Sequence, residues 1–239
     1  MEKKEIVQSI TGFVGKLLRA RFGKGPEALS VFLDKQSVVL TLNRFTNPVE
    51  DELLSREDEK TFRYTRELLV KSLIPDIQTF FEQELGLPPM NFFYDWNIGQ
   101  ASGMITGLVR DESKILKAAQ DYPGRESVHK QIADLLGKVQ TTPDLTLSWW
   151  IDPDNLFVFR KGLAILLEKE FNDLGQSDIL KTAKRKLEKE LLWQDAGIGS
   201  ALGRQMTDLY IDWDFDRDDS VLICRFGGEE CPVRGGFVR

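Results

Sequence analysis

The sequence predicts an α+β fold built from two tandem helix-hairpin-helix-hairpin repeats, each with an antiparallel sheet covered by helices. Two internal matches predict the duplication. Residues 30–34 (SVFLD) return 118 positions later as 148–152 (SWWID), and residues 94–96 (YDW) return 117 positions later as 211–213 (IDW). Self-similarity over this distance is typical of a copied supersecondary unit. We therefore expect two pseudo-twofold-related copies that imitate a dimer.

Hydrophobic periodicity and turn residues define the elements of repeat 1, residues 1–110. Apolar residues at three- and four-residue intervals predict the first helix, which the glycines of residues 23–26 (GKGP) should end. Short runs rich in Val, Leu and Phe predict strands. The expected elements are a helix at 4–22, strands at 28–34 and 37–44, helices over 48–85 interrupted near Ser55 and Pro75, and strands at 90–97 and 104–109.

Repeat 2, residues 128–226, repeats the same order of elements. Residues 111–127 contain a DYPG turn cluster and are expected to form a linker, and residues 227–239 a flexible tail. Repeat 2 should lack four residues where repeat 1 has its glycine loop. The expected elements are a helix at 128–139, strands at 145–151 and 155–160, helices at 163–171 and 177–202, and strands at 206–214 and 220–226.

Composition narrows the class of protein. The formal net charge is −6 and the pI about 5.1, which argues against broad binding to nucleic acids. Cys224 and Cys231 give no disulfide framework, and residues 1–5 (MEKKE) do not begin a secretory signal. The apolar runs are too short to span a bilayer. We expect a cytoplasmic protein without membrane insertion.

Several segments of repeat 1 carry a family resemblance. They are residues 21–26 (RFGKGP) after the first helix, residues 38–42 (VVLTL), residues 45–53 (FTNPVEDEL), and Arg66 in the following helix. In these features repeat 1 resembles the MpsC family, a bacterial domain of unknown function named for a proposed sodium-translocating, membrane-potential-generating system. The resemblance implies an accessory or regulatory protein linked to ion or inorganic-carbon transport. Repeat 2 departs from it, because the glycine loop and the proline are missing.

The glycine loop suggests a site for an anion or an acidic partner. Glycines let backbone amides approach an anion, and basic side chains neutralise it. The alternative is a glycine helix cap with cations near the negative helix end. The candidate residues are Arg19, Arg21, Lys24, Arg44 and Arg66.

Aromatic residues in the predicted strands suggest a second site. They could line a pocket for a planar ligand between the repeats, although strand aromatics more often belong to the core or an interface. The candidates are Trp96, Trp149, Trp150 and Trp213.

Two charged runs of repeat 2 are expected to be solvated. Residues 212–219 (DWDFDRDD) alternate acids in a way that invites calcium, but the EF-hand pattern fails, so a strand end facing water is the expectation. The basic run of residues 181–189 (KTAKRKLEK) is interrupted by Glu188 and should be an exposed helix face.

No catalytic residue, metal or cofactor is predicted. His129 lies near a predicted helix start with Ser127 as N-cap, and Cys224 reads as a small buried residue. Two functions remain open. One is a non-enzymatic accessory or regulatory protein that contacts a protein partner, such as a transporter subunit, as a monomeric pseudo-dimer or a homodimer. The other is a small-molecule sensor or enzyme with an aromatic cavity between the repeats.

Overall fold

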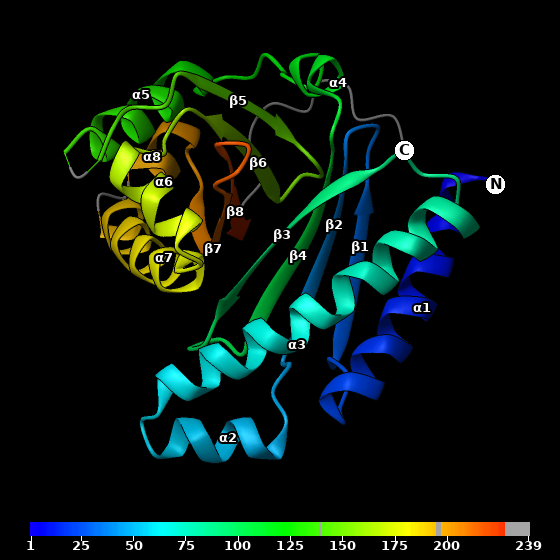
Figure 1. Cartoon of the computed structure of the whole chain (residues 1–239). Coiled ribbons are helices and arrows are strands. Elements are labelled where there is room, and N and C mark those ends of the chain that lie inside the picture. Colours follow the sequence, from blue (N-terminus) through cyan, green and yellow to red (C-terminus); the bar gives the residue numbers. More distant parts are fainter. Residues whose placement is uncertain (139, 195–196, 228–239) are drawn as a thin grey trace. The chain divides into compact units, whose positions relative to one another are not determined.

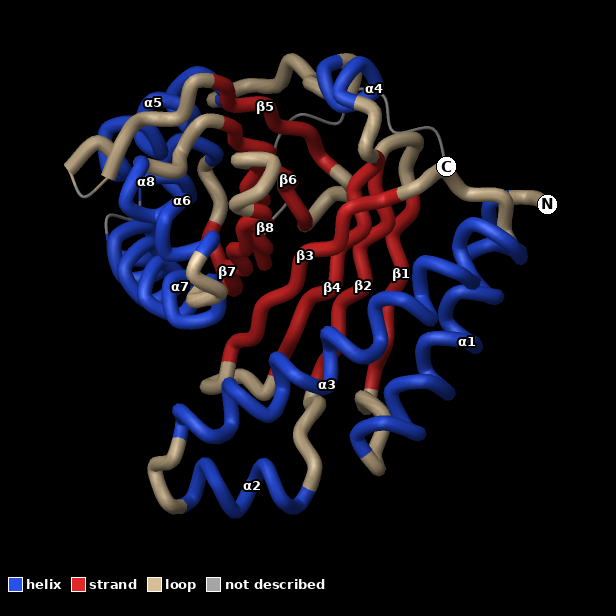
Figure 2. The backbone as a smooth tube through the Cα atoms, in the orientation of Figure 1, coloured by secondary structure: helices blue, strands red, loops and turns tan. Residues whose placement is uncertain are grey.

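A computed structural model describes residues 1–138, 140–194 and 197–227 of the chain. The chain divides into two compact units, Met1–Lys117 and Ala118–Arg239. Each unit contains one four-stranded antiparallel sheet. The strands and the helices beside them can be followed in Figure 1 and Figure 2. The predicted α+β class with two similar repeats is confirmed.

Unit 1 has a sheet with the strand order β1-β2-β4-β3, in which all neighbours are antiparallel. The helices α1 and α3 lie along one face of this sheet (Figure 2). The elements are α1 Lys3–Phe22, β1 Ala28–Leu33, β2 Ser37–Asn43, α2 Pro48–Ser55, α3 Glu59–Thr79, the π-helix η1 Phe80–Glu84, β3 Met90–Asn97, β4 Ser102–Val109 and α4 Glu112–Leu116.

Unit 2 repeats this sheet order as β5-β6-β8-β7. Its core is formed by apolar side chains from α5, the sheet and α8. The elements are α5 Arg125–Leu136, β5 Leu145–Trp150, β6 Asn155–Lys161, α6 Leu166–Asp173, α7 Ser177–Gln194, α8 Gly197–Leu202, β7 Gln205–Asp214 and β8 Asp219–Gly227.

The strand registers show that the two sheets are copies. Ser37 pairs with Leu108 between β2 and β4, and Asn155 pairs with Arg225 between β6 and β8, at the corresponding positions. The two outer hairpins agree in the same way, because Trp96 pairs with Gly103 and Trp213 with Ser220. Register is strongly specified where a sheet face is buried, so this agreement over separate strand pairs supports one ancestral unit.

The strand registers of the first hairpins differ by one residue. In unit 1 Val31 pairs with Leu40, whereas in unit 2 Ser148 pairs with Val158. The shift from Leu40 to Val158 is 118, but the shift from Val31 to Ser148 is 117. Residues 30–34 and 148–152 therefore correspond at the turn, but along the strand the residues that occupy equivalent places in the two sheets differ from this match by one position.

The break expected at Pro75 is absent from helix α3. It runs from Glu59 to Thr79 with Pro75 inside it, and the irregularity appears only afterwards, as the widened turn η1. Proline removes one backbone donor, and packing of the buried face maintains the helix. The break near Ser55 is present, because α2 ends there and Asp58 caps α3 by accepting a hydrogen bond from the Thr61 amide.

The segment expected to be a linker contains structure. It holds α4 and the first residues of α5, whose N-cap is Gly124 rather than Ser127. The expected helix at 177–202 consists of α7 and α8. Of the expected tail, Gly227 is the last residue of β8, and residues 228–239 lie outside the described residues.

Candidate functional site

A buried arginine forms the centre of unit 1. Arg66 on α3 is 1% exposed, and its guanidinium binds Glu50 on α2 through two bonds, Nε to Oε1 and Nη2 to Oε2, both 2.8 Å long. Nη2 also donates to the backbone oxygen of Phe45. Burial lowers the pKa of Arg66, and the bonds to Glu50 oppose that shift. A bidentate, charge-assisted pair is the arrangement that best offsets the desolvation of a buried guanidinium.

Aromatic rings enclose the same guanidinium. Its carbon lies 4.3 Å from the ring centroid of Trp96, and the rings of three phenylalanines also lie within 5.6 Å of it. Trp96 can lie flat at this point because its strand partner is Gly103, where a Cβ atom would overlap the indole. The further rings are those of Phe22, Phe45 and Phe62. Cation-π contacts add to the ion pair in such a desolvated site.

This buried centre holds the glycine loop in place. Glu50 accepts from the Asn47 amide at 2.9 Å, and the Asn47 side chain in turn caps α2 by accepting from the Glu50 amide. The Asn47 Nδ2 donates to the Phe22 oxygen at 3.2 Å, which ties the end of α1 to the start of α2. Gly23 follows with a φ of 74°, the left-handed cap that ends a helix without strain. The Arg66–Glu50 pair therefore supports the loop through these hydrogen bonds.

Four of the five basic candidate residues are exposed, and one is buried. Arg19 and Lys24 are exposed, and neither makes an ion pair with the described residues. Arg21 pairs with Asp76 at 3.1 Å, and Arg44 pairs with Glu27 at 3.3 Å, both on the surface. Arg66 is buried, so it supports the loop and cannot contact a partner directly. With that correction, the loop as a binding site stays a prediction.

A family model matches unit 1. Residues 2–110 match the family model described as Na+-translocating membrane potential-generating system (MpsC). Unit 1 is an MpsC-like domain. Comparisons with curated proteins and with solved structures found no match. Among residues 1–138, 140–194 and 197–227, no helix is long and apolar enough to cross a membrane.

The segments that carried the resemblance converge in the MpsC-like domain. Phe22, from one segment, and Phe45, Asn47 and Glu50, from another, all contact Arg66 or one another. Their shared position explains why these residue types occur together: they build one support for the loop at residues 23–26.

Unit 2 carries a weaker version of the same centre. Lys184 on α7 binds Glu168 on α6 at 2.7 Å, and its ammonium lies 5.6 Å from the Trp213 ring. Sixteen residues separate the two partners, as in the pair of the MpsC-like domain. The Ile165 amide donates to Glu168 at 3.3 Å, as Asn47 does to Glu50. Lysine gives one point charge in place of the arginine fork, so the pairing is less directional.

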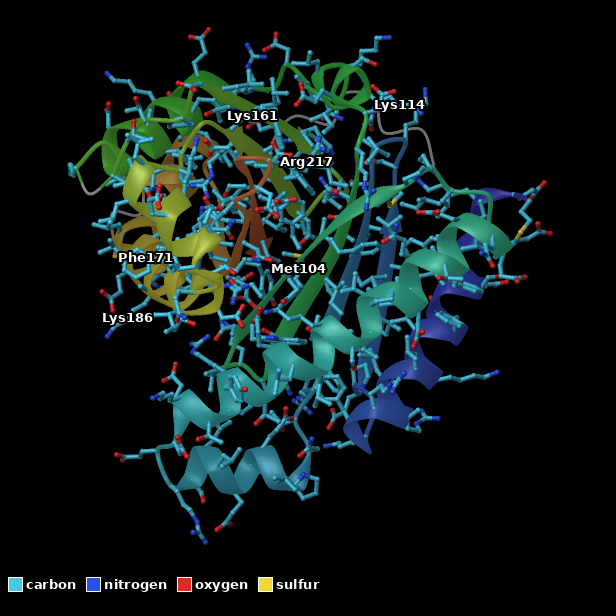
Figure 3. All side chains as sticks on the ribbon, in the orientation of Figure 1. Met104, Lys114, Lys161, Phe171, Lys186 and Arg217 are labelled. Carbon is cyan, nitrogen blue, oxygen red and sulfur yellow. The ribbon has the colours of Figure 1, made fainter. Side chains whose placement is uncertain are left out.

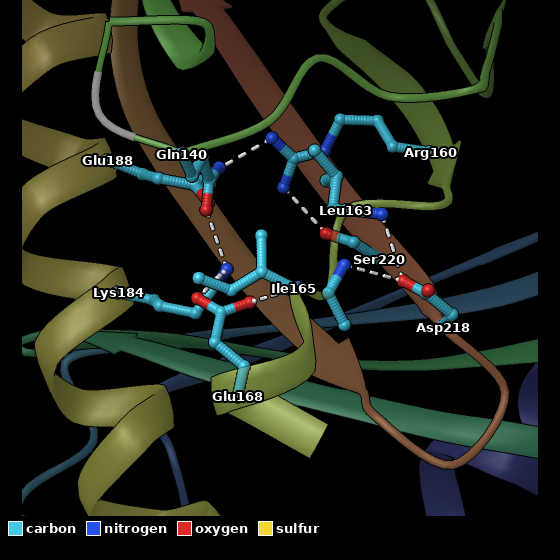
Figure 4. A network of polar contacts seen from close by, with 10 residues as sticks. Gln140, Arg160, Leu163, Ile165, Glu168, Lys184, Glu188, Asp218 and Ser220 are labelled. Atoms are coloured by element: carbon cyan, nitrogen blue, oxygen red, sulfur yellow. Dashed lines mark hydrogen bonds and ion pairs between the residues drawn. The ribbon is translucent and has the colours of Figure 1, made fainter. Parts of the chain in front are cut away.

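A second buried ion pair exists in unit 2. Arg160 Nη1 binds Glu188 at 2.8 Å and Arg160 Nη2 donates to Ser220 at 2.6 Å, as Figure 4 shows. Gln140 joins the two pairs, because it donates to Glu188 and accepts from Lys184. The matching positions of the MpsC-like domain hold Leu42, Val70 and Gly103, so neither the ion pair nor the hydrogen bond to the serine has a counterpart there. The three differences are visible in the sequence, but nothing local in the sequence indicates that these side chains meet.

The four tryptophan candidates each pack within their own unit. Trp96 lies over Arg66, and Trp213 stacks against Phe215. Trp149 stacks on Phe157 with centroids 4.4 Å apart, and Trp150 contacts Tyr122, Phe226 and Arg204. A ligand pocket between the repeats stays a prediction.

The two charged runs of unit 2 meet each other, which corrects the expectation that both are solvated. Asp212 is fully buried and binds Arg185 at 2.8 Å and Lys181 at 3.1 Å. Asp219 is also buried and binds Lys161. Lys186 on the outer side of α7 remains exposed (Figure 3). Opposite charges on a strand and the helix that covers it can pair in the interior.

His129 and Cys224 have structural surroundings. His129 Nε2 and the Tyr122 hydroxyl each lie 2.7 Å from the hydroxyl of Ser148, which is fully buried. Desolvation, with a smaller contribution from Arg125, lowers the pKa of His129. Burial raises the pKa of the Cys224 thiol to about 12, so this cysteine lacks the thiolate that nucleophilic chemistry requires.

Proposed function

We propose that this chain is a non-enzymatic accessory or regulatory protein of a membrane ion or inorganic-carbon transport system. It acts in the cytoplasm by binding an acidic protein partner, such as a transporter subunit. The description of the MpsC family supports the link to an ion system. The role of a binding protein is the part that goes beyond this description.

The observation that carries the proposal is the basic surface around the loop at residues 23–26. Arg19 and Lys24 are exposed cations without an ion pair among the described residues. Lys24 lies in the loop and Arg19 in the last turn of α1, next to the contacts that the buried Arg66–Glu50 pair supports. A rigid support lowers the entropy cost of binding. Cations that no carboxylate neutralises can meet an acidic partner without first breaking a contact.

Charge reversal tests the proposal. The tagged full-length protein captures partners from native membranes and cytosol, and a Lys24→Glu and Arg19→Glu double variant is compared with Lys35→Glu. Lys35 is an exposed lysine in the turn at the other end of β1. We expect the double variant to lose a membrane subunit that the wild type and Lys35→Glu retain.

Two results would contradict the proposal. Equal capture by all three proteins would exclude the loop as the contact. A stoichiometric small molecule in native mass spectra, without a captured subunit, would instead favour the sensor or enzyme alternative.

A further inference from the structure

Strand β1 lies at the outer edge of the sheet of unit 1 (Figure 2). At the turn into β2 the Asp34 amide donates to the Ser37 oxygen, which makes these two residues a hydrogen-bonded pair. Such pairs alternate along an antiparallel ladder, so the backbone N–H and C=O groups of Leu29, Val31 and Leu33 point away from β2. Within the described residues none of these groups has a hydrogen-bond partner.

The counterpart of this edge in unit 2 is covered by the chain itself. The register places Ser148 of β5 where β1 has Val31. The Ser148 oxygen accepts from the Gln120 amide at 3.0 Å, and the Trp150 amide donates to the Gln120 side chain at 3.1 Å. A residue that precedes α5 thus binds the polar groups whose equivalents β1 leaves without a bond.

The edge strands β3 and β7 carry acidic side chains that occupy a backbone donor. Asp95 on β3 accepts from the Trp96 amide at 2.7 Å, and Asp208 on β7 accepts from the Leu209 amide at 2.9 Å. Charged residues on an edge strand discourage pairing with another chain. Strand β1 (ALSVFL) has neither a charge nor a proline, and its residue types favour strands. An edge without such protection indicates that another strand pairs with it.

The sequence of β1 is complementary to itself. Val31 is the middle one of the three outward residues, so in an antiparallel pair of two copies Val31 faces Val31, and Leu29 faces Leu33 of the other copy. Each outward N–H then meets a C=O. Glu27 and Lys35 lie four positions before and after Val31 and carry opposite charges. Each Glu27 therefore comes next to Lys35 of the second copy.

Both of these charges can serve such a contact. Lys35 is exposed and has no ion pair among the described residues. Glu27 pairs with Arg44 at 3.3 Å at the surface, where an ion pair is easily exchanged. A parallel arrangement would instead place like charges side by side, which is destabilising. The charges therefore favour the antiparallel pairing of two copies.

Helix α1 packs beside β1 through glycine residues. A Cβ atom on Gly15 would lie 3.9 Å from the Leu29 side chain, so this side of α1 faces the strand. Gly12 lies one turn earlier on the same side, is exposed, and a Cβ atom there would meet no neighbouring side chain within 4 Å. Glycine weakens a helix interior, and no contact among the described residues requires it at Gly12. This position leaves room for α1 of a second copy when two β1 strands pair.

We propose that β1 is the interface of a homodimer, in which two copies join their unit 1 sheets edge to edge by antiparallel β1–β1 pairing. Residues 29–33 are half-buried within one chain, and a second strand covers more of their side chains. This interface goes beyond the function proposed for the basic loop and does not depend on it. Lys35 contacts a second copy here, whereas the loop variants are scored by capture of a membrane subunit.

Sedimentation velocity of the purified full-length protein over a concentration series tests the charge contacts. We expect a concentration-dependent dimer. Lys35→Glu should raise its dissociation constant about tenfold or more, because both contacts with Glu27 become repulsive. Adding Glu27→Lys to the same chain should restore the dimer, since the exchanged charges again meet their opposites. Lys60→Glu is the matched control, because Lys60 is exposed on α3 and the change in net charge is the same.

Val31→Pro tests the backbone pairing separately. Proline removes the Val31 N–H, which the β1–β2 ladder does not use, so the sheet should stay intact while the dimer is lost. Circular dichroism verifies that the variants are folded.

Three results would overturn the proposal. They are a monomer at every concentration, a dimer that neither Lys35→Glu nor Val31→Pro weakens, or a weakened dimer that the charge exchange does not restore. No membrane component is present, so failure here is separate from failure of the proposed function.

Discussion

Removal of the charge on Glu50 is the most informative perturbation of unit 1. Glu50→Gln keeps the size of the side chain but leaves the Arg66 guanidinium without a counter-charge. Both side chains are 2% exposed, so water cannot replace the lost partner. Breaking a buried pair by removing one partner costs about 3–5 kcal/mol. At an m-value of about 2 kcal/mol per molar urea, the midpoint falls by roughly 1.5–2.5 M.

The assay must report on unit 1 alone. Denaturant-dependent hydrogen exchange, followed by mass spectrometry of peptides from α2 and α3, gives the free energy of opening of that unit. Glu52→Gln is the matched control, because Glu52 lies on the same helix and binds Arg56 at the surface at 2.7 Å. Its loss should cost less than about 0.5 kcal/mol.

A second replacement tests the physical reason. Arg66→Met in the Glu50→Gln background removes the stranded charge and should recover part of the lost stability, since apolar side chains can replace a buried pair at low cost. A loss of stability in Glu50→Gln no larger than that in Glu52→Gln would contradict a buried, coupled pair. A Glu50→Gln, Arg66→Met double variant less stable than Glu50→Gln alone would contradict it as well.

Three more predictions concern other contacts, each measured by chemical unfolding. Gly103→Ala should destabilise unit 1 by about 1–3 kcal/mol, because its Cβ overlaps the Trp96 ring; an unchanged midpoint would show that the ring can move. Glu188→Val should cost about 3–5 kcal/mol, whereas Glu188→Val with Arg160→Leu should cost far less; equal losses would exclude a coupled pair. The pKa of His129 is lowered in the folded state, so folding favours the neutral imidazole. The folded state therefore has its full stability above about pH 6.5, the pKa of an unperturbed histidine, and loses part of it as the pH falls through the lower pKa of the folded state. His129→Gln should remove that acid-side loss, and an unchanged pH profile would contradict it.

The element order and the duplication could be predicted because their signals are local. Apolar residues at three- and four-residue intervals predicted α1, and short runs of aromatic and β-branched residues predicted the strands. Pro75 misled the prediction because helix propensity is weaker than packing of the buried face. The one-residue offset of the first hairpin was hidden because matching residues do not reveal strand pairing.

The buried ion pairs were harder to predict from the sequence. Glu50 and Arg66 lie 16 residues apart on different helices, and nothing local indicates that they meet. The signal was present between the repeats, since Glu168 and Lys184 keep opposite charges at the same separation. A charge pair that is kept at a fixed separation in both copies favours contact over solvation. The same comparison would have shown that Arg66 belongs to the interior.

A photo-crosslinking amino acid placed at position 24 tests the functional account most directly. The full-length protein is irradiated with native membranes, and position 35 serves as the control site on the same unit. We expect a crosslink from position 24 to a subunit of a membrane ion system, with an acidic contact segment, and none of this kind from position 35. Equal crosslinking from both positions, or none from position 24, would contradict it.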